Sequence, residues 1–241
     1  MATTIATRNS TAFRNGLQAG ASIAIGYIPI AITFGLLAKS AGLTISETVL
    51  MSLLVFAGAA QYMSLNMIVL GSGVFEIVMT TFILNIRHFL MSASLNEKVE
   101  EETLWKKALY SFGITDETFS VAATKEGTIQ TGYMFGVIFI AYSSWVVSSG
   151  IGYVIGSSLP ASLQESMAVA LYAMFIGLLV PSLKRHRKVV VLAGTAAILN
   201  TIFSLVLSIA PGWSIVLATI ISAVGIEFIF RKTSTKGGRG P

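Results

Sequence analysis

The chain has 241 residues, of which 54% are hydrophobic and only 11% are charged, and its mean hydropathy is +0.78. A soluble domain carries about a quarter charged residues, so this composition excludes a water-soluble protein and favours a membrane protein. The formal net charge of +5 does not indicate nucleic-acid binding, because basic residues in the cytoplasmic loops of membrane proteins account for it.

Seven apolar runs approach or exceed the ~20 residues that a helix needs to cross a hydrocarbon core. They predict an all-α polytopic membrane protein with about seven transmembrane helices, some of them broken or kinked, in a single domain over residues 16–230. Residues 1–15 are expected to form a tail, and the basic, Gly-rich residues 231–241 a disordered tail. The predicted spans are Gly16–Ala38, Thr48–Leu70, Val74–Leu95, Gly132–Gly156, Leu163–Leu183, Val189–Ala210 and Trp213–Phe230.

The first two predicted spans contain residues that disturb a helix. Pro29 lies in the middle of the first, and proline removes a helix hydrogen bond, so we expect a kink or a break there. The second carries small residues at mid-depth, including Gly58 and Ala59, followed by Gln61. Small residues allow close helix packing; alternatively, a broken helix exposes backbone groups that bind carboxylates, amines and ions. Gln61 favours the second interpretation, because a buried amide needs a partner.

The third predicted span places Asn85, Arg87 and His88 within four residues, and Glu76 lies near its start. An arginine at the bilayer centre costs at least ~2.5 kcal/mol. Arg87 and His88 either extend to the interface as anchors or face an aqueous cavity as parts of a site. Histidine is the side chain that changes its charge most readily near neutral pH, so His88 is a candidate proton carrier.

Residues 96–131 form a long predicted cytoplasmic loop with an acidic start. The sequence "LWKKALYSF" within it predicts an amphipathic helix able to lie in the membrane interface. Thr115 and Asp116 then resemble the N-cap of another helix. Asp116 and Glu117 are either ordinary first-turn acids of that helix or, next to a cavity, carriers of a proton.

Basic residues predict the orientation of the last spans. The loop "LKRHRKV" and the C-terminal tail are rich in Lys and Arg, so both are expected in the cytoplasm. Seven crossings then place the N-terminus outside, against the indication of Arg8 and Arg14. Either the later loops dominate, or one early segment is re-entrant. A loose echo of "VFAGAAQYMSLN" in "VLAGTAAILN" indicates either an internal three-helix repeat or chance.

The sequence offers little for catalysis or metal binding. It contains no cysteine and only two histidines, and no HExxH motif is present. A Ser–His pair using Ser52 or Ser64 is a remote option. We therefore expect no metal, no cofactor and no enzymatic activity.

Four ordered blocks carry a family resemblance: "GYIPIAITFGLLAKSAGLT", "MSLLVFAGAAQY", "LNIRHFLMSASL" and "GITDETFSV". They resemble the AzlC-type large subunit of branched-chain amino acid exporters, the LIV-E family, over about residues 20–125. The basic position that precedes the acidic block in this family is less clear here, where Lys106 and Lys107 stand.

The resemblance implies export of Leu, Ile, Val and Met across the cytoplasmic membrane, driven by the proton or membrane potential, with a small AzlD-type membrane subunit as partner. The alternative is a channel or carrier for another small solute. Arg87 is the expected partner of the substrate carboxylate, and Phe56, Met63 and Met91 are expected near its apolar side chain. The candidate substrate-binding residues are Pro29, Phe34, Gly35, Gly58, Ala59, Gln61, Asn85 and Arg87, and the candidate proton-coupling residues are His88, Asp116 and Glu117.

Overall fold

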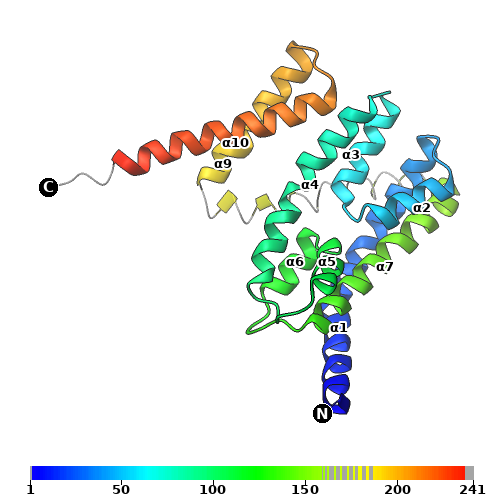
Figure 1. Ribbon diagram of the computed structural model, residues 1–241. Helices are drawn as coiled ribbons and strands as arrows, with labels where there is room; N and C mark the ends of the chain where they lie inside the picture. Colours follow the sequence, from blue (N-terminus) through cyan, green and yellow to red (C-terminus); the bar gives the residue numbers. More distant parts are fainter. Residues whose placement is uncertain are drawn as a thin grey trace. The chain divides into compact units, whose positions relative to one another are not determined.

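The computed structural model describes residues 2–158 and 187–236, with isolated positions between 160 and 184, and these residues are mainly helical (Figure 1). They form two compact units. The first unit consists of Met1–Leu65 and Leu84–Ala170, and the second of Asn66–Ile83 and Leu171–Pro241. The predicted span Leu163–Leu183 lies outside the continuously described residues.

Five of the described helices contain a segment long and apolar enough to cross a membrane, which confirms the all-α polytopic class. These segments are Ser10–Ser40, Val74–Asn96, Thr131–Ile155, Arg187–Val206 and Pro211–Phe228. The α-helices are α1 (Ala2–Ser40), α2 (Ile45–Leu54), α3 (Gly58–Val69), α4 (Val74–Asn96), α5 (Leu104–Phe112), α6 (Asp116–Ala123), α7 (Thr131–Ile155), α9 (Arg187–Thr201) and α10 (Pro211–Lys236).

The first unit is built on α1 and α7, which run parallel and touch backbone to backbone. A Cβ atom added to Gly16 would overlap the backbone of α7 beside Gly136, and one added to Gly152 would overlap the backbone of Ile32. Between these points, the Ser144 hydroxyl donates to the Ala24 carbonyl at 2.6 Å. Glycine at the contact is therefore what permits this approach, as is common between membrane helices.

The predicted interruption at Pro29 is absent, because α1 is one continuous α-helix from Ala2 to Ser40. Proline withdraws a single hydrogen bond, and helices packed inside a membrane protein tolerate that loss. The Pro29 carbonyl accepts a hydrogen bond from the Thr33 hydroxyl at 2.9 Å.

The second predicted run is broken, as one interpretation of its small residues anticipated. Residues 55–57 are not helical, and they separate α2 from α3. The α2 helix starts just after α1 ends, and its Leu53 carbonyl accepts from Tyr142, half-way along α7. The α3 helix then returns, since Leu65 packs against Phe34 and Ala38 near the end of α1. We call α2, residues 55–57 and α3 the first hairpin.

Residues 104–123 form a second hairpin that points the other way. Its two ends are joined beside the start of α7, where the backbone of Ile129 pairs with that of Lys98 and Glu100. The turn at residues 113–115 reaches the middle of the bundle, where the Thr115 and Tyr27 hydroxyls lie 2.8 Å apart. The predicted amphipathic helix is confirmed as α5, but its C-terminal end lies against α7: Phe112 contacts the ring of Tyr142. We call α5, residues 113–115 and α6 the second hairpin.

In the second unit, α9 packs against α10, and Glu76 binds the start of α10. One carboxylate oxygen of Glu76 accepts from the backbone N–H of Gly212 at 2.9 Å and lies 3.4 Å from that of Trp213. These N–H groups open α10, so the carboxylate satisfies donors that have no partner within the helix. The Ser214 hydroxyl also bonds Asn200 of α9 at 2.9 Å.

Candidate functional site

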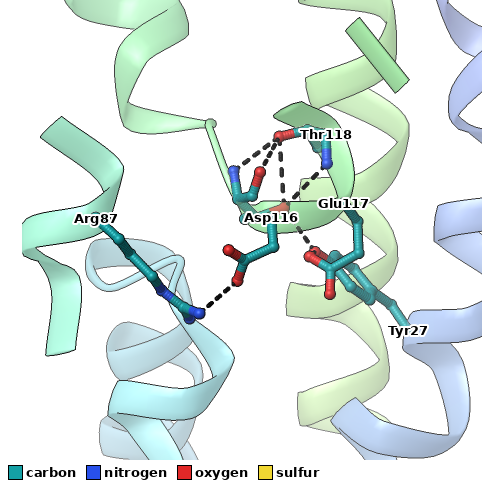
Figure 2. A network of polar contacts seen from close by, with 6 residues as sticks. Tyr27, Arg87, Asp116, Glu117 and Thr118 are labelled. Carbon is teal, nitrogen blue, oxygen red and sulfur yellow. Dashed lines mark hydrogen bonds and ion pairs between the residues drawn. The ribbon is translucent and has the colours of Figure 1, made fainter. Parts of the chain in front are cut away.

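The first turn of α6 places two acids in the interior of the first unit (Figure 2). Thr115 is the N-cap, as the sequence predicted, and forms a capping box with Thr118. The Thr118 N–H donates to the Thr115 hydroxyl oxygen, and the Thr115 N–H donates to the Thr118 hydroxyl oxygen at 2.8 Å. This fixed helix start holds Asp116 and Glu117 in the positive end of the helix dipole.

Asp116 binds Arg87 of α4. Arg87 Nη1 lies 2.8 Å from Asp116 Oδ2, and the two side chains are 39% and 23% exposed. Arg87 is therefore paired within the protein, which removes much of the cost of placing a guanidinium in an apolar span. The Nε atom of Arg87 is buried and has no partner among the described residues. Its N–H can therefore still donate a hydrogen bond.

Glu117 binds α1 instead. The Tyr27 hydroxyl donates to Glu117 Oε2 at 2.6 Å and also lies against Thr115. Two neighbouring acids thus connect one short helix to two long ones, Asp116 to α4 and Glu117 to α1 (Figure 2). A change in the charge of either acid would alter the attachment of α6 to one of these helices.

The electrostatics of Asp116 favour a proton. Burial raises the pKa of its carboxyl above the usual value, and the nearby Arg87 guanidinium opposes this only in part. A carboxyl poised in this way changes charge closer to neutral pH than a free aspartate does. Asp116 is thus a candidate to take up and release a proton.

Two further predicted residues lie on α4 close to Arg87. His88 follows it in the chain and is half-buried. Asn85 is also half-buried, and its side-chain oxygen has no partner among the described residues. The Asn85 side chain can therefore accept a hydrogen bond from a ligand. Because Asn85 and Arg87 are two residues apart on α4, their side chains point in different directions.

Gln61 belongs to a different polar cluster, near the tip of the first hairpin. It is fully buried, and its side-chain oxygen accepts from the Trp145 indole N–H at 2.8 Å. Its amide nitrogen donates to Ser52, whose hydroxyl donates in turn to Ser149. The described bonds of Gln61 thus go to α2 and α7, and the Ser52 hydroxyl proposed for a Ser–His pair is already engaged in this cluster.

Three of the other predicted substrate residues, Phe34, Gly35 and Gly58, lie around this cluster. Phe34 is fully buried, with ring contacts to Tyr62 and Trp145. Gly35 lies against the α7 backbone. Pro29 is half-buried within α1, and Gly58 and Ala59 open α3.

Tyr27 and Trp145 were not among the predicted site residues. Each carries a polar atom in the middle of an apolar span, and such an atom usually finds a partner when it is buried. That signal is present in the sequence. The partners, Glu117 and Gln61, are far away along the chain and become visible only in the structure.

A sequence model described as "AzlC protein" matches residues 22–159. The chain is 32% identical to "Inner membrane protein YgaZ" of Escherichia coli (strain K12) over 214 residues, 84% of this chain and 87% of the relative. It is 26% identical to "Branched-chain amino acid transport protein AzlC" of Bacillus subtilis (strain 168) over 180 residues, 73% of this chain and 70% of the relative.

An archaeal membrane protein, from Archaeoglobus fulgidus, is 32% identical over 192 residues, which cover 78% of this chain and 84% of the relative. No solved structure matches the chain significantly. The membrane proteins among these relatives agree with the five apolar helices, so the protein is a multi-pass membrane protein. With more than half of its length matched by the family's sequence model, the chain belongs to the AzlC family.

Proposed function

We propose that this protein exports Leu, Ile, Val and Met across the cytoplasmic membrane, driven by the proton gradient or the membrane potential, as the large subunit of a two-component exporter. Its family membership supports a transporter in place of an enzyme. The name of the Bacillus subtilis relative supports branched-chain amino acids as the substrate class.

The observation that carries the proposal is the ion pair between Arg87 and Asp116, 2.8 Å apart inside an apolar bundle. A guanidinium is suited to a carboxylate, because its planar N–H groups match the two oxygens. Asp116 and a substrate carboxylate can then alternate on Arg87. Export driven by a proton gradient requires exchange: Asp116 takes up a proton on the outside once the substrate has left, and releases it on the inside before the next substrate binds.

The remaining predicted residues take four roles in this proposal. His88 and Glu117 flank the ion pair and are second carriers of the proton, and Asn85 accepts from the substrate ammonium. The backbone at Gly58 and Ala59 contributes near the substrate. Pro29, Phe34, Gly35 and Gln61 act by holding α1, α7 and the first hairpin in position.

The orientation follows from the first hairpin. If it turns back within the bilayer, the chain makes six crossings and not seven, provided that Leu163–Leu183 crosses. Both termini then lie in the cytoplasm, and Arg8 and Arg14 agree with the basic loop "LKRHRKV" and the basic tail. This removes the conflict between the N-terminal charges and the later loops.

The small AzlD-type subunit remains our proposed partner, and α4 offers a surface for it. One side of α4 carries exposed apolar residues at helical spacing, which face either lipid or another membrane helix. They are Phe75, Val78, Phe82, Ile86 and Phe89.

Growth on dipeptides that contain Leu, Ile, Val or Met tests the function. Cells lacking the gene should accumulate intracellular Leu, Ile, Val and Met, and expression of the chain together with its small partner should restore low pools. Lysine released from a lysine dipeptide serves as the control. A protonophore should abolish the restoration. Equal branched-chain pools with and without the gene would reject the proposal and favour a carrier or channel for another solute.

A further inference from the structure

The two hairpins approach each other from opposite ends of the α1–α7 pair. The first hairpin starts and returns at the end where α1 finishes, as the packing of Leu65 on Ala38 shows. The second starts and returns where α7 begins, through the backbone pairing of Ile129 with Lys98. Each reaches about half-way along α7, so neither crosses the whole bundle.

The tips of the hairpins meet the same aromatic rings. Phe56 at the tip of the first hairpin contacts the Tyr142 ring, with centroids 5.2 Å apart, and Phe112 of the second hairpin contacts it at 5.9 Å. Tyr27 contacts Phe56 at 6.1 Å, and its hydroxyl lies 2.8 Å from Thr115. We call Tyr27, Phe56, Phe112 and Tyr142 the tip cluster.

Polar groups lie directly beside the tip cluster. Phe56 is only 4% exposed, so the non-helical backbone at 55–57 is covered by protein, as a membrane interior requires. Asp116 follows Thr115 at the second tip and binds Arg87. Transporters commonly place their substrate sites at half-depth, where short helices end.

We infer that the amino acid passes between the tips of these two re-entrant hairpins, and that the tip cluster is the barrier that selects an apolar side chain of limited size. This inference rests on the proposed export function. The buried ring of Phe56 closes the route beside Tyr142. The Arg87–Asp116 pair holds the polar end of the substrate at the edge of the tip cluster.

The first test concerns the path of the chain and does not depend on transport. The chain contains no cysteine, so single cysteines can be introduced directly. A membrane-impermeant maleimide should label Ser46→Cys and Ser72→Cys from one face of the membrane, and Glu101→Cys and Glu126→Cys from the other face. Labelling of Ser46→Cys and Ser72→Cys from opposite faces would show that the first hairpin crosses, and would overturn the inference.

The second test concerns the barrier, again without substrate. Ile114 is fully buried at the second tip. A small thiol reagent applied from the Ser46 face should leave Ile114→Cys unmodified, and should modify it at least about tenfold faster when Phe56→Ala is added. The matched control is Phe139→Ala, which removes a ring of α7 outside the tip cluster. Equal rates with the two alanine variants would contradict the barrier.

The third test concerns selectivity. Phe56→Ala should raise export of phenylalanine relative to leucine about tenfold, whereas Phe56→Leu, which stays apolar and bulky, and Phe139→Ala should keep the preference for leucine. Unchanged selectivity in Phe56→Ala would place the barrier elsewhere. If the wild type exports no branched-chain amino acid, the proposed function fails, and the labelling results still decide the hairpins and the barrier.

Discussion

Arg87 of α4 and Asp116 of α6 form an ion pair in the interior of the first unit, with 2.8 Å between Nη1 and Oδ2. The pair connects a long apolar helix to the tip of the second hairpin. A partly exposed ion pair contributes little net stability, because solvent screens its attraction. Charged groups within the apolar helices of a membrane protein indicate a task, and transport of a zwitterion supplies one.

Substitution Arg87→Lys should reduce export about 10- to 100-fold at an unchanged protein level, because lysine keeps the charge but loses the planar fork. Losing one charge-assisted hydrogen bond, about 1.5–3 kcal/mol, accounts for that range. Efflux of labelled leucine measures the effect. Arg14→Lys, the same change at an exposed arginine, is the control. Wild-type efflux in Arg87→Lys would return Arg87 to a structural role.

Asp116 should make stability depend on pH. Burial raises the pKa of its carboxyl in the folded state, so the folded form binds this proton more tightly than the unfolded form. The resulting stabilisation is complete below the ordinary pKa of about 3.9 and is lost as the pH rises through the folded pKa. Asp116→Asn cannot titrate, so its Tm relative to wild type should rise as the pH increases above about 4.

Thermal unfolding of the purified protein over this pH range measures the difference. Glu101→Gln removes one negative charge at an exposed position and controls for the change in net charge. A Tm difference between Asp116→Asn and wild type that stays constant with pH would argue against proton binding at Asp116.

The contact between α1 and α7 should depend on Gly152. A Cβ there would overlap the backbone of Ile32, whereas a Cβ at Gly150 would only touch Val49 at 3.5 Å. Gly152→Ala should therefore lower stability by about 1–3 kcal/mol through overpacking. Gly150→Ala should be neutral or slightly stabilising, because alanine favours a helix. Equal Tm values for the two variants would disprove the close backbone contact.

The orientation can be checked with reporters. Fusions after Lys188, after Arg231 and at the N-terminus should all report a cytoplasmic position, and one in "GSSLPAS" an external position. The reason is the excess of basic residues in "LKRHRKV", in the tail and near Arg8 and Arg14. An external N-terminus with a cytoplasmic C-terminus would require an odd number of crossings, and so a first hairpin that crosses.

The sequence by itself determined the properties that depend on local composition and pattern. The small charged fraction determines the membrane class, and apolar length locates the spans. The Thr115 cap was predictable because capping involves only neighbouring residues. The same reasoning showed that Arg87 and Gln61 need partners, since burying an unpaired polar group is costly.

Only the tertiary structure decided where those partners are and which way the chain turns. The apolar run at residues 48–70 is long enough to cross, yet Leu65 returns to Phe34 and Ala38. Run length is the same for a crossing helix and for a re-entrant pair, so local sequence cannot distinguish the two paths. The partner of Arg87 is Asp116, and the partner of Gln61 is Trp145; each partner belongs to another helix. These contacts join segments far apart along the chain, and no local pattern specifies them.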